Sequence, residues 1–182
     1  MPSLTELTKL VQHAFLNKNQ KKMRKALDKI LDEATIEFSA ELYSLSVISY
    51  VLSKILSKPR YYGRPYQESF LRIKQILAFM VKNAKDKKKF MSGIDNLEET
   101  ILTMEVRDKR YVKSLMEKGR LKTAAILYAQ GVSLGMASEI TGISSQEIMD
   151  YAGKTMMFDR LKEEVPLSKR RKMAKKMLEG EK

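Results

Sequence analysis

Residues 137–153 read ASEITGISSQEIMDYAG, and in this stretch a glycine separates two short amphipathic segments. Ser138 precedes Gly142 by four positions, the spacing at which a small residue lets one helix pack closely against a second before the chain leaves helical geometry at a glycine. Ile143 and Ile148 follow at positions that can anchor the second helix onto the first. The spacing predicts two helices joined by a tight turn.

The second helix of this pair carries its own start signal. Ser144 and Glu147 have the Ser-x-x-Glu spacing of a capping box, in which the hydroxyl accepts from the Glu147 amide and the carboxylate accepts from the Ser144 amide. This pattern assigns a structural role to Glu147. The sequence indicates no such role for the other acidic residue of the helix, Asp150.

The segment LYAQGVSLGMASEITGISSQEIMDY, residues 127–151, resembles the helix-turn-helix superfamily. Within it the segment is similar to small prokaryotic proteins with the pattern YxxGxxSLGxAAELxGIS, some of which are regarded as antitoxin-like partners of PIN-domain toxins. The resemblance covers roughly residues 121–153 and leaves the rest of the chain unmatched. The residues in register are Tyr128, Gly131, Ser133, Leu134, Gly135, Ala137, Glu139, Gly142, Ile143 and Ser144.

The resemblance implies that the exposed start of the second helix, with Ser145, Gln146, Met149 and Asp150, faces a groove of DNA. Gln146 can pair with adenine, and a serine can bond to a base or a phosphate. Met149 and Asp150 suit a groove poorly, because a carboxylate is repelled by phosphates unless it accepts from a cytosine amino group. Two uses of the module therefore remain open, DNA reading and protein contact.

The chain before this module shows helical periodicity almost throughout residues 1–105. Residues 41–58 are apolar on most of the helix circumference and predict a central helix. The stretch KPRYYGRP, residues 58–65, breaks the pattern with two prolines and a glycine. We predict an all-α fold with five helices in a bundle or in stacked helical hairpins. The last of them has an apolar stripe made of Phe90, Ile94, Leu97, Ile101 and Leu102.

Three parts follow from this pattern. Residues 1–105 form a helical body, residues 106–160 form the helix-turn-helix module with its leading helix, and residues 161–182 form a basic C-terminal tail helix. The leading helix covers residues 109–130, and Gly119 marks a point at which it can be interrupted.

The charge of the chain favours a polyanionic partner. Its 182 residues include 35 Lys and Arg against 22 Asp and Glu, a formal net charge of +13. Nucleic acid is the first candidate and a membrane surface the second, while a merely soluble cationic protein is the alternative. The basic residues flank the helix-turn-helix stretch rather than lie on it, a distribution that favours phosphate contacts and weakly specific binding.

Candidate nucleic-acid contacts lie on the second helix, in the flanks, in the tail and in the loop of residues 58–65. In this loop arginines alternate with tyrosines, which suits unstacked bases of single strands or RNA. The alternative is that the tyrosines pack the loop onto the bundle. The predicted contacts are Ser145, Gln146, Met149, Arg120, Lys122, Lys154, Arg60, Tyr61, Tyr62, Arg64, Lys169, Arg170, Arg171, Lys172, Lys175 and Lys176.

Several kinds of chemistry lack their residues. The chain has no cysteine, which excludes disulfides, thiolate metal sites and thiol nucleophiles and makes the cytoplasm the expected compartment. The one histidine, His13, falls on the polar side of the first predicted helix, where we expect a surface residue. No apolar run reaches the roughly 18 residues typical of a membrane span. We expect no catalytic residue, no cofactor, no metal site and no membrane partner.

Together these features predict a non-enzymatic nucleic-acid-binding protein, with DNA favoured over RNA, that acts as a transcriptional or nucleoid-associated regulator. The body would supply a surface for a homodimer or for a protein partner. The alternative is an RNA- or ribosome-associated factor, or an antitoxin-like interaction protein, whose helix-turn-helix contacts protein. The sequence leaves the target, the oligomeric state and the purpose of Asp150 open.

Overall fold

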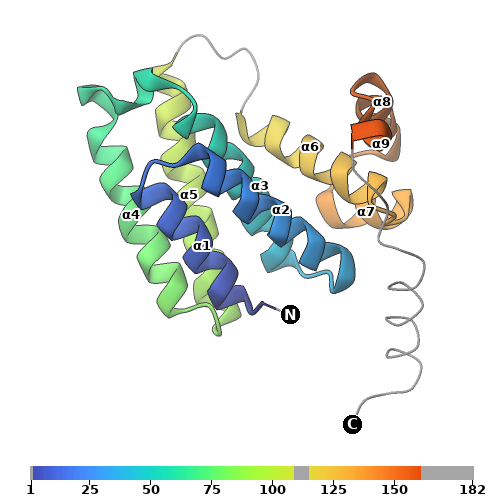
Figure 1. The fold of residues 1–182 in the computed structure, drawn as a ribbon, viewed down its shortest axis with the longest axis horizontal. Coiled ribbons are helices and arrows are strands. Elements are labelled where there is room, and N and C mark those ends of the chain that lie inside the picture. The colour runs from blue at the N-terminus through green and yellow to red at the C-terminus, as the bar shows by residue number, and fades with distance from the viewer. Residues whose placement is uncertain (1, 109–114, 161–182) are drawn as a thin grey trace. The chain divides into compact units, whose positions relative to one another are not determined.

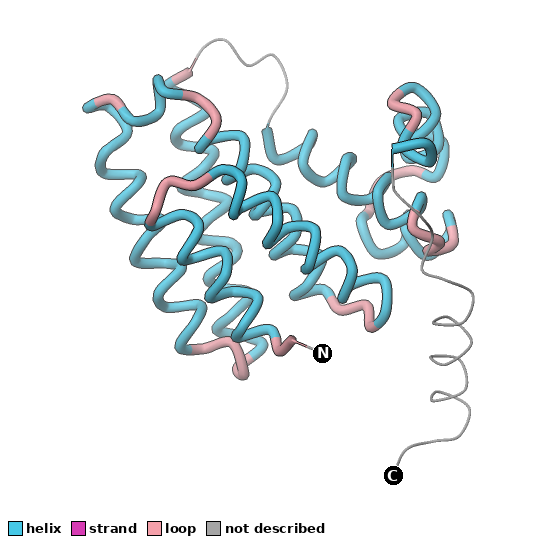
Figure 2. Tube along the Cα trace, viewed as in Figure 1, coloured by secondary structure: helices cyan, strands magenta, loops and turns pink. Residues whose placement is uncertain are grey.

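The computed structural model describes residues 2–108 and 115–160. Within these ranges the regular structure is entirely helical, which confirms the predicted all-α class (Figures 1 and 2). The predicted tail helix, residues 161–182, lies outside the described residues.

The body contains five longer helices. They are α1 (Leu4–Leu16), α2 (Gln20–Ile36), α3 (Ala40–Leu56), α4 (Gln67–Lys82) and α5 (Lys87–Arg107). Helix α3 contacts α1, α2 and α5, while α1 also packs against α4 and α4 against α5. The central position of α3 matches the apolar circumference of its sequence.

Short polar side chains determine where the helices of the body begin. Ser3 completes a capping box before α1, because its hydroxyl accepts from the Glu6 amide and its own amide donates to the Glu6 carboxylate. The side chains of Asn19, Ser39 and Asp86 accept from the amides three residues on and begin α2, α3 and α5 in the same way.

Helix α3 buries serines among its apolar residues without leaving their hydroxyls unpaired. Ser46, Ser49 and Ser53 donate to carbonyls of their own helix at 2.6–2.7 Å. Because each donor is satisfied locally, the helix can be covered on nearly all sides by apolar neighbours.

The predicted break between the third and fourth helices is confirmed. Two short 3-10 helices, η1 (Pro59–Tyr62) and η2 (Arg64–Tyr66), fill the loop, and each has a proline in its first turn. A residue with a fixed φ and no N–H suits this position. In the neighbouring α5 one predicted core position is wrong, because Leu102 is 45% exposed and Met104 is buried instead.

Helix α6 (Leu115–Ala129) passes through Gly119 without interruption. A β-carbon at Gly119 would lie only 3.0 Å from Val51 Cγ2 and 3.3 Å from Tyr50 Cδ1 of α3. The glycine therefore permits close helix packing, and the interruption that the sequence allows at this position does not occur.

Contacts divide the chain into two units, residues 1–123 and 124–182. The division falls inside α6 rather than at the predicted boundary between residues 105 and 106, because the first half of α6 packs on α3. In the second unit, α6 is followed by α7 (Leu134–Thr141), α8 (Ser145–Lys154) and the short α9 (Met157–Arg160). Helix α8 contacts both α7 and α9.

Candidate nucleic-acid interface

The tight turn predicted at Gly142 is present between α7 and α8. Gly142 has the left-handed φ of 68°, and its amide donates to the Ser138 carbonyl at 2.9 Å. The Ser138 hydroxyl also donates to the Ile143 carbonyl at 2.7 Å, which ties the end of α7 to the turn. Ala137 and Ile148 are fully buried, as the packing of the second helix onto the first requires.

The predicted capping box of α8 is half formed. The Ser144 hydroxyl accepts from the Glu147 amide at 3.2 Å. The structure shows no return bond from the Ser144 amide to the Glu147 carboxylate among the residues it describes. Glu147 is exposed at the first turn of α8, where its charge interacts favourably with the helix dipole.

The outer face of α8 gives Asp150 a partner. Gln146 Nε2 donates to Asp150 Oδ1 at 2.8 Å, and both side chains are exposed. One of the two amide hydrogens that Gln146 would offer to a base is therefore engaged within the helix. Met149 is exposed on the same helix, and Ser145 is half-buried.

Charge is distributed unevenly between the two units. From residue 124 to residue 160 the sequence has four Asp or Glu and two Lys or Arg, a net charge of −2. From residue 1 to residue 123 it has 25 Lys or Arg and 14 Asp or Glu, a net charge of +11. Helices α7 and α8 therefore lie in an acidic stretch of the chain, and the body carries most of the positive charge.

Two predicted flanking contacts are engaged with the body. Arg120 pairs with Glu98 at 2.7 Å, and the Lys122 ammonium lies 5.0 Å from the centroid of the Tyr50 ring. These contacts hold the first half of α6 on α3 and α5. Lys154, at the end of α8, is exposed.

The tyrosine loop packs onto the body, and the prediction that the Tyr61 ring stacks on bases is wrong. Tyr61 is 1% exposed and meets the edge of Tyr66 with ring centroids 5.1 Å apart. The Tyr62 hydroxyl donates to the Leu56 carbonyl at 2.8 Å, and its ring is half-buried. The packing alternative therefore describes both tyrosines.

The two arginines of this loop have different surroundings. Arg60 Nε lies 2.6 Å from Asp108 Oδ2, and Asp108 is only 4% exposed. Arg64 is exposed. Arg60 therefore stabilises a buried carboxylate, whereas Arg64 is still available as a contact. The six predicted contacts of the tail, Lys169, Arg170, Arg171, Lys172, Lys175 and Lys176, lie outside the described residues.

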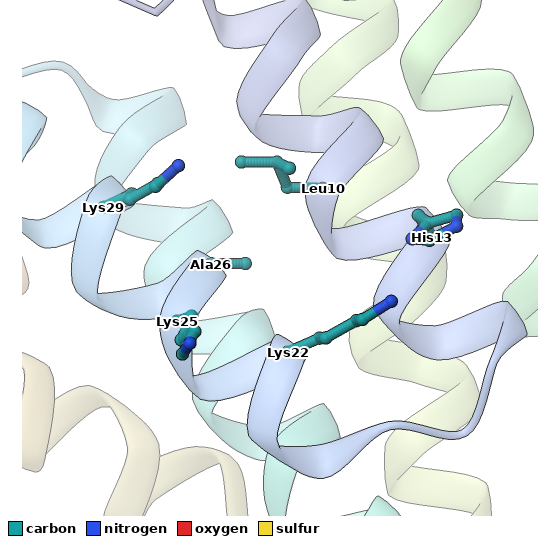
Figure 3. Close-up of a pocket in the computed structure, with 6 residues that line it drawn as sticks. All are labelled: Leu10, His13, Lys22, Lys25, Ala26 and Lys29. Atoms are coloured by element: carbon teal, nitrogen blue, oxygen red, sulfur yellow. The ribbon is translucent and has the colours of Figure 1, made fainter.

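A basic groove between α1 and α2 was missed by the sequence analysis. We call it the α1–α2 groove; it has a cavity volume of about 300 Å³. Figure 3 shows Lys22 extending toward His13 and Lys29 toward Leu10 across the groove. His13 is exposed, as expected. The residues that line the groove are Leu10, His13, Lys22, Lys25, Ala26 and Lys29.

The lysines of the groove have no ion-pair partner among the described residues. The nearest acidic residue in the sequence, Asp28, interacts with a different set of groups. Burial raises the pKa of the Asp28 carboxyl and Asp32 adds to the rise, while Arg24 and Lys122 lower it. The spacing of Lys22, Lys25 and Lys29, at i, i+3 and i+7, places them on one helix face and is the sequence signal that could have revealed the groove.

Within the described residues no cluster of three or more His, Cys, Asp or Glu could hold a metal ion. None of the helices described is long and apolar enough to cross a membrane. A scan against protein-family models found no match, and searches of curated proteins and of solved structures found none either.

Proposed function

We propose that this protein is a non-enzymatic nucleic-acid-binding protein that binds the phosphates of a duplex through α2 and uses its helix-turn-helix for protein contact. The observation that carries the proposal is the density of exposed positive charge on α2 that has no ion-pair partner among the described residues. Five basic residues, Lys21, Lys22, Arg24, Lys25 and Lys29, are exposed within nine positions.

The dimensions of α2 suit a phosphate backbone. Eight helical steps from Lys21 to Lys29 cover about 12 Å at 1.5 Å per residue. Duplex DNA carries one charge per roughly 1.7 Å of its axis, so about seven phosphates lie along that length. Basic side chains at this spacing neutralise several phosphates without reading a base.

The packing of the tyrosine loop favours a duplex over a single strand. Unstacked bases need exposed aromatic faces, whereas Tyr61 is buried and the Tyr62 hydroxyl is bonded to the body. DNA is the first target to test and duplex RNA the second, because both present a regular phosphate backbone.

The surface of the second unit favours protein contact. Its sequence from residue 124 to residue 160 has a net charge of −2, which repels phosphates. Met136, Met149, Met156 and Phe158 are each between 43% and 65% exposed. Flexible apolar side chains of this kind are typical of adaptable protein-binding surfaces.

The test is a salt titration of duplex binding, followed by fluorescence anisotropy. The triple variant Lys22→Gln, Lys25→Gln, Lys29→Gln should weaken binding at least tenfold at about 0.1 M salt. It should also reduce the magnitude of the slope of log K against log salt concentration by about 2 to 3, because each lost phosphate contact removes about 0.9 from the slope. A DNA duplex and an RNA duplex of equal length are compared in parallel.

The matched control changes three exposed lysines at the junction of α4 and α5, Lys82, Lys85 and Lys88, to Gln. It removes the same charge and should alter the slope by less than 1. Equal effects of the two triple variants would refute the role of α2. Gln146→Ala should leave duplex affinity within about twofold and sequence preference unchanged, whereas a changed preference would restore the DNA-reading use of α8.

A further inference from the structure

We infer that a second copy of this chain docks its α8 into the α1–α2 groove, so that the protein self-associates through an acidic helix on a basic groove. The inference names the partner for the protein contact proposed above and rests on that part of the proposed function. Both surfaces are present in the same chain: the groove is rimmed by lysines, and α8 exposes carboxylates.

The α1–α2 groove combines a basic rim with an apolar floor. Lys22, Lys25 and Lys29 form the rim, and none of them is paired within the described residues. Leu10, which is 39% exposed, and Ala26 form the floor. A bare phosphate backbone would leave this floor uncovered, whereas an amphipathic helix would cover it.

Helix α8 presents the complementary chemistry. Glu147 and Asp150 lie three residues apart and are exposed, as is Met149, at 43%. A β-carbon at the exposed Gly153 would have no neighbour within 4 Å, so the last turn of α8 can approach another helix closely. At about 100° per residue, Asp150 lies between Met149 and Glu147 around α8, so one exposed face combines an apolar side chain with a carboxylate and matches a lysine rim above Leu10.

The spacings of the two helices are compatible. Lys22 and Lys29 are seven residues apart, or about 10 Å along α2, while Glu147 and Asp150 are about 4.5 Å apart along α8. The two carboxylates can therefore pair with Lys22 and Lys25 or with Lys25 and Lys29, and Lys25 takes part in both arrangements. Lys25 and Asp150 are accordingly the pair to change.

Reciprocal docking gives a closed dimer. If each copy provides one groove and one α8, a two-fold axis relates two identical contacts and no surface is left to continue a chain of molecules. The same lysines are assigned to phosphates in the proposed function, so the dimer and the duplex compete for α2. A duplex in excess should therefore dissociate the dimer.

The experiment is sedimentation velocity on nucleic-acid-free full-length protein, from about 1 to 200 μM, at low and at high salt. The wild-type chain should dimerise at low salt and dissociate at high salt, because exposed charge pairs are screened. Lys25→Glu and Asp150→Lys should each weaken dimerisation at least tenfold. Lys88→Glu, an equal charge reversal at an exposed residue of α5, should leave it unchanged.

Mixing the two single variants provides the decisive arm. In a 1:1 mixture of Lys25→Glu and Asp150→Lys chains, one contact keeps the wild-type pair and the other has its charges exchanged, so a heterodimer should form more strongly than either homodimer. A misfolded variant would not be rescued in this way. A wild-type chain that is monomeric at about 200 μM in low salt, or a mixture without heterodimer, would overturn the inference.

Duplex binding measured on the Asp150→Lys chain keeps the two proposals apart. This variant should lose self-association while its duplex affinity stays equal or rises, because α2 is unchanged. If the triple variant Lys22→Gln, Lys25→Gln, Lys29→Gln binds the duplex normally while the charge exchange restores dimerisation, the phosphate proposal fails alone. If the reverse holds, the dimer inference fails alone.

Discussion

At the scale of single residues, Arg60 and Tyr43 each have a role that depends on burial. Arg60 meets the nearly buried Asp108 at 2.6 Å, a pair that joins the tyrosine loop to the end of α5. Tyr43 is 9% exposed, and its hydroxyl makes no hydrogen bond within the described residues. Removing the partner of a buried charge lowers the free energy of unfolding, whereas removing a buried hydroxyl that makes no hydrogen bond raises it.

Arg60→Ala should lower the free energy of unfolding by about 2 kcal/mol, because it removes the half-buried arginine that faces the buried Asp108 carboxylate and leaves that charge in a poorly solvated place. Arg64→Ala, at the exposed arginine of the same loop, should change it by less than about 0.5 kcal/mol. Urea unfolding followed by circular dichroism checks both values. An Arg60→Ala chain as stable as Arg64→Ala would show that the ion pair adds nothing.

Tyr43→Phe should raise the free energy of unfolding by about 1 kcal/mol, because it removes a buried hydroxyl that has no hydrogen-bond partner among the described residues. Tyr62→Phe should lower it by about 1 kcal/mol, because the Tyr62 hydroxyl donates to the Leu56 carbonyl. The two substitutions delete the same atom, so the opposite signs in thermal or urea unfolding isolate the hydrogen bond. Equal signs would contradict the assignment.

The pH dependence of Tyr43 follows from its burial, which raises the pKa of the phenol from 10.0 to about 12. The neutral phenol is favoured in the folded chain, so its contribution is fully present below pH 10 and is lost as the pH rises toward 12. Two pKa units correspond to roughly 2.7 kcal/mol. The Tyr43→Phe chain should therefore lose less stability than the wild type between pH 10 and 12. If the free energies of unfolding of the two chains fell in parallel with pH, the raised pKa of Tyr43 would be refuted.

At the scale of helices, glycine marks both tight packing and open surface. A β-carbon at Gly93 of α5 would overlap the side chain of Met80, which is fully buried in α4. A β-carbon at Gly153 of α8 would have no neighbour within 4 Å. Gly93 therefore allows α4 and α5 to pack closely, whereas Gly153 leaves open space beside α8.

Gly93→Ala should lower the free energy of unfolding by about 1 kcal/mol, because overpacking costs roughly 1 to 3 kcal/mol and exceeds the gain in helix propensity. Gly153→Ala should raise it by about 0.5 kcal/mol, because only the propensity gain applies near the end of a helix. Chemical denaturation of the two chains provides the comparison. A stabilised Gly93→Ala chain would mean that Met80 moves aside without cost.

The helices and their turns could be predicted because their signals are local. Gly142 and Ser144 carry the conformational and capping requirements of the turn within a few residues, and the two prolines of the loop mark its break. The contact between Gln146 and Asp150 was also within reach, because residues four apart are neighbours on a helix.

The remaining features could not be predicted because they depend on distant residues. Arg60 and Asp108 are 48 positions apart, and a loop arginine beside tyrosines reads the same whether it binds a base or a buried carboxylate. Gly119 likewise reads the same as a break or as a packing contact until α3 is placed beside it. The α1–α2 groove needs two helices side by side before its lysines acquire an apolar floor.

At the scale of the whole molecule, the partition of charge matters more than its sum. A net charge of +13 suggests a uniformly basic protein, whereas the sequence from residue 124 to residue 160 is acidic. A basic body and an acidic module in one chain can bind a polyanion and a basic protein surface separately. This partition underlies both proposals, and neither requires α8 to read a base.

Helix α6 sets a constraint on how such a chain can be inherited. Its first half, with Gly119, covers Val47 and Val51 of α3, while its second half begins the unit that contains α7 and α8. Recombination at residue 105 would transfer all of α6 together with α7 and α8, and it would leave Val47 and Val51 of the remaining body uncovered. Residues 106–160 therefore cannot be exchanged independently of the body. An exchanged segment would need a glycine at position 119 that packs against α3.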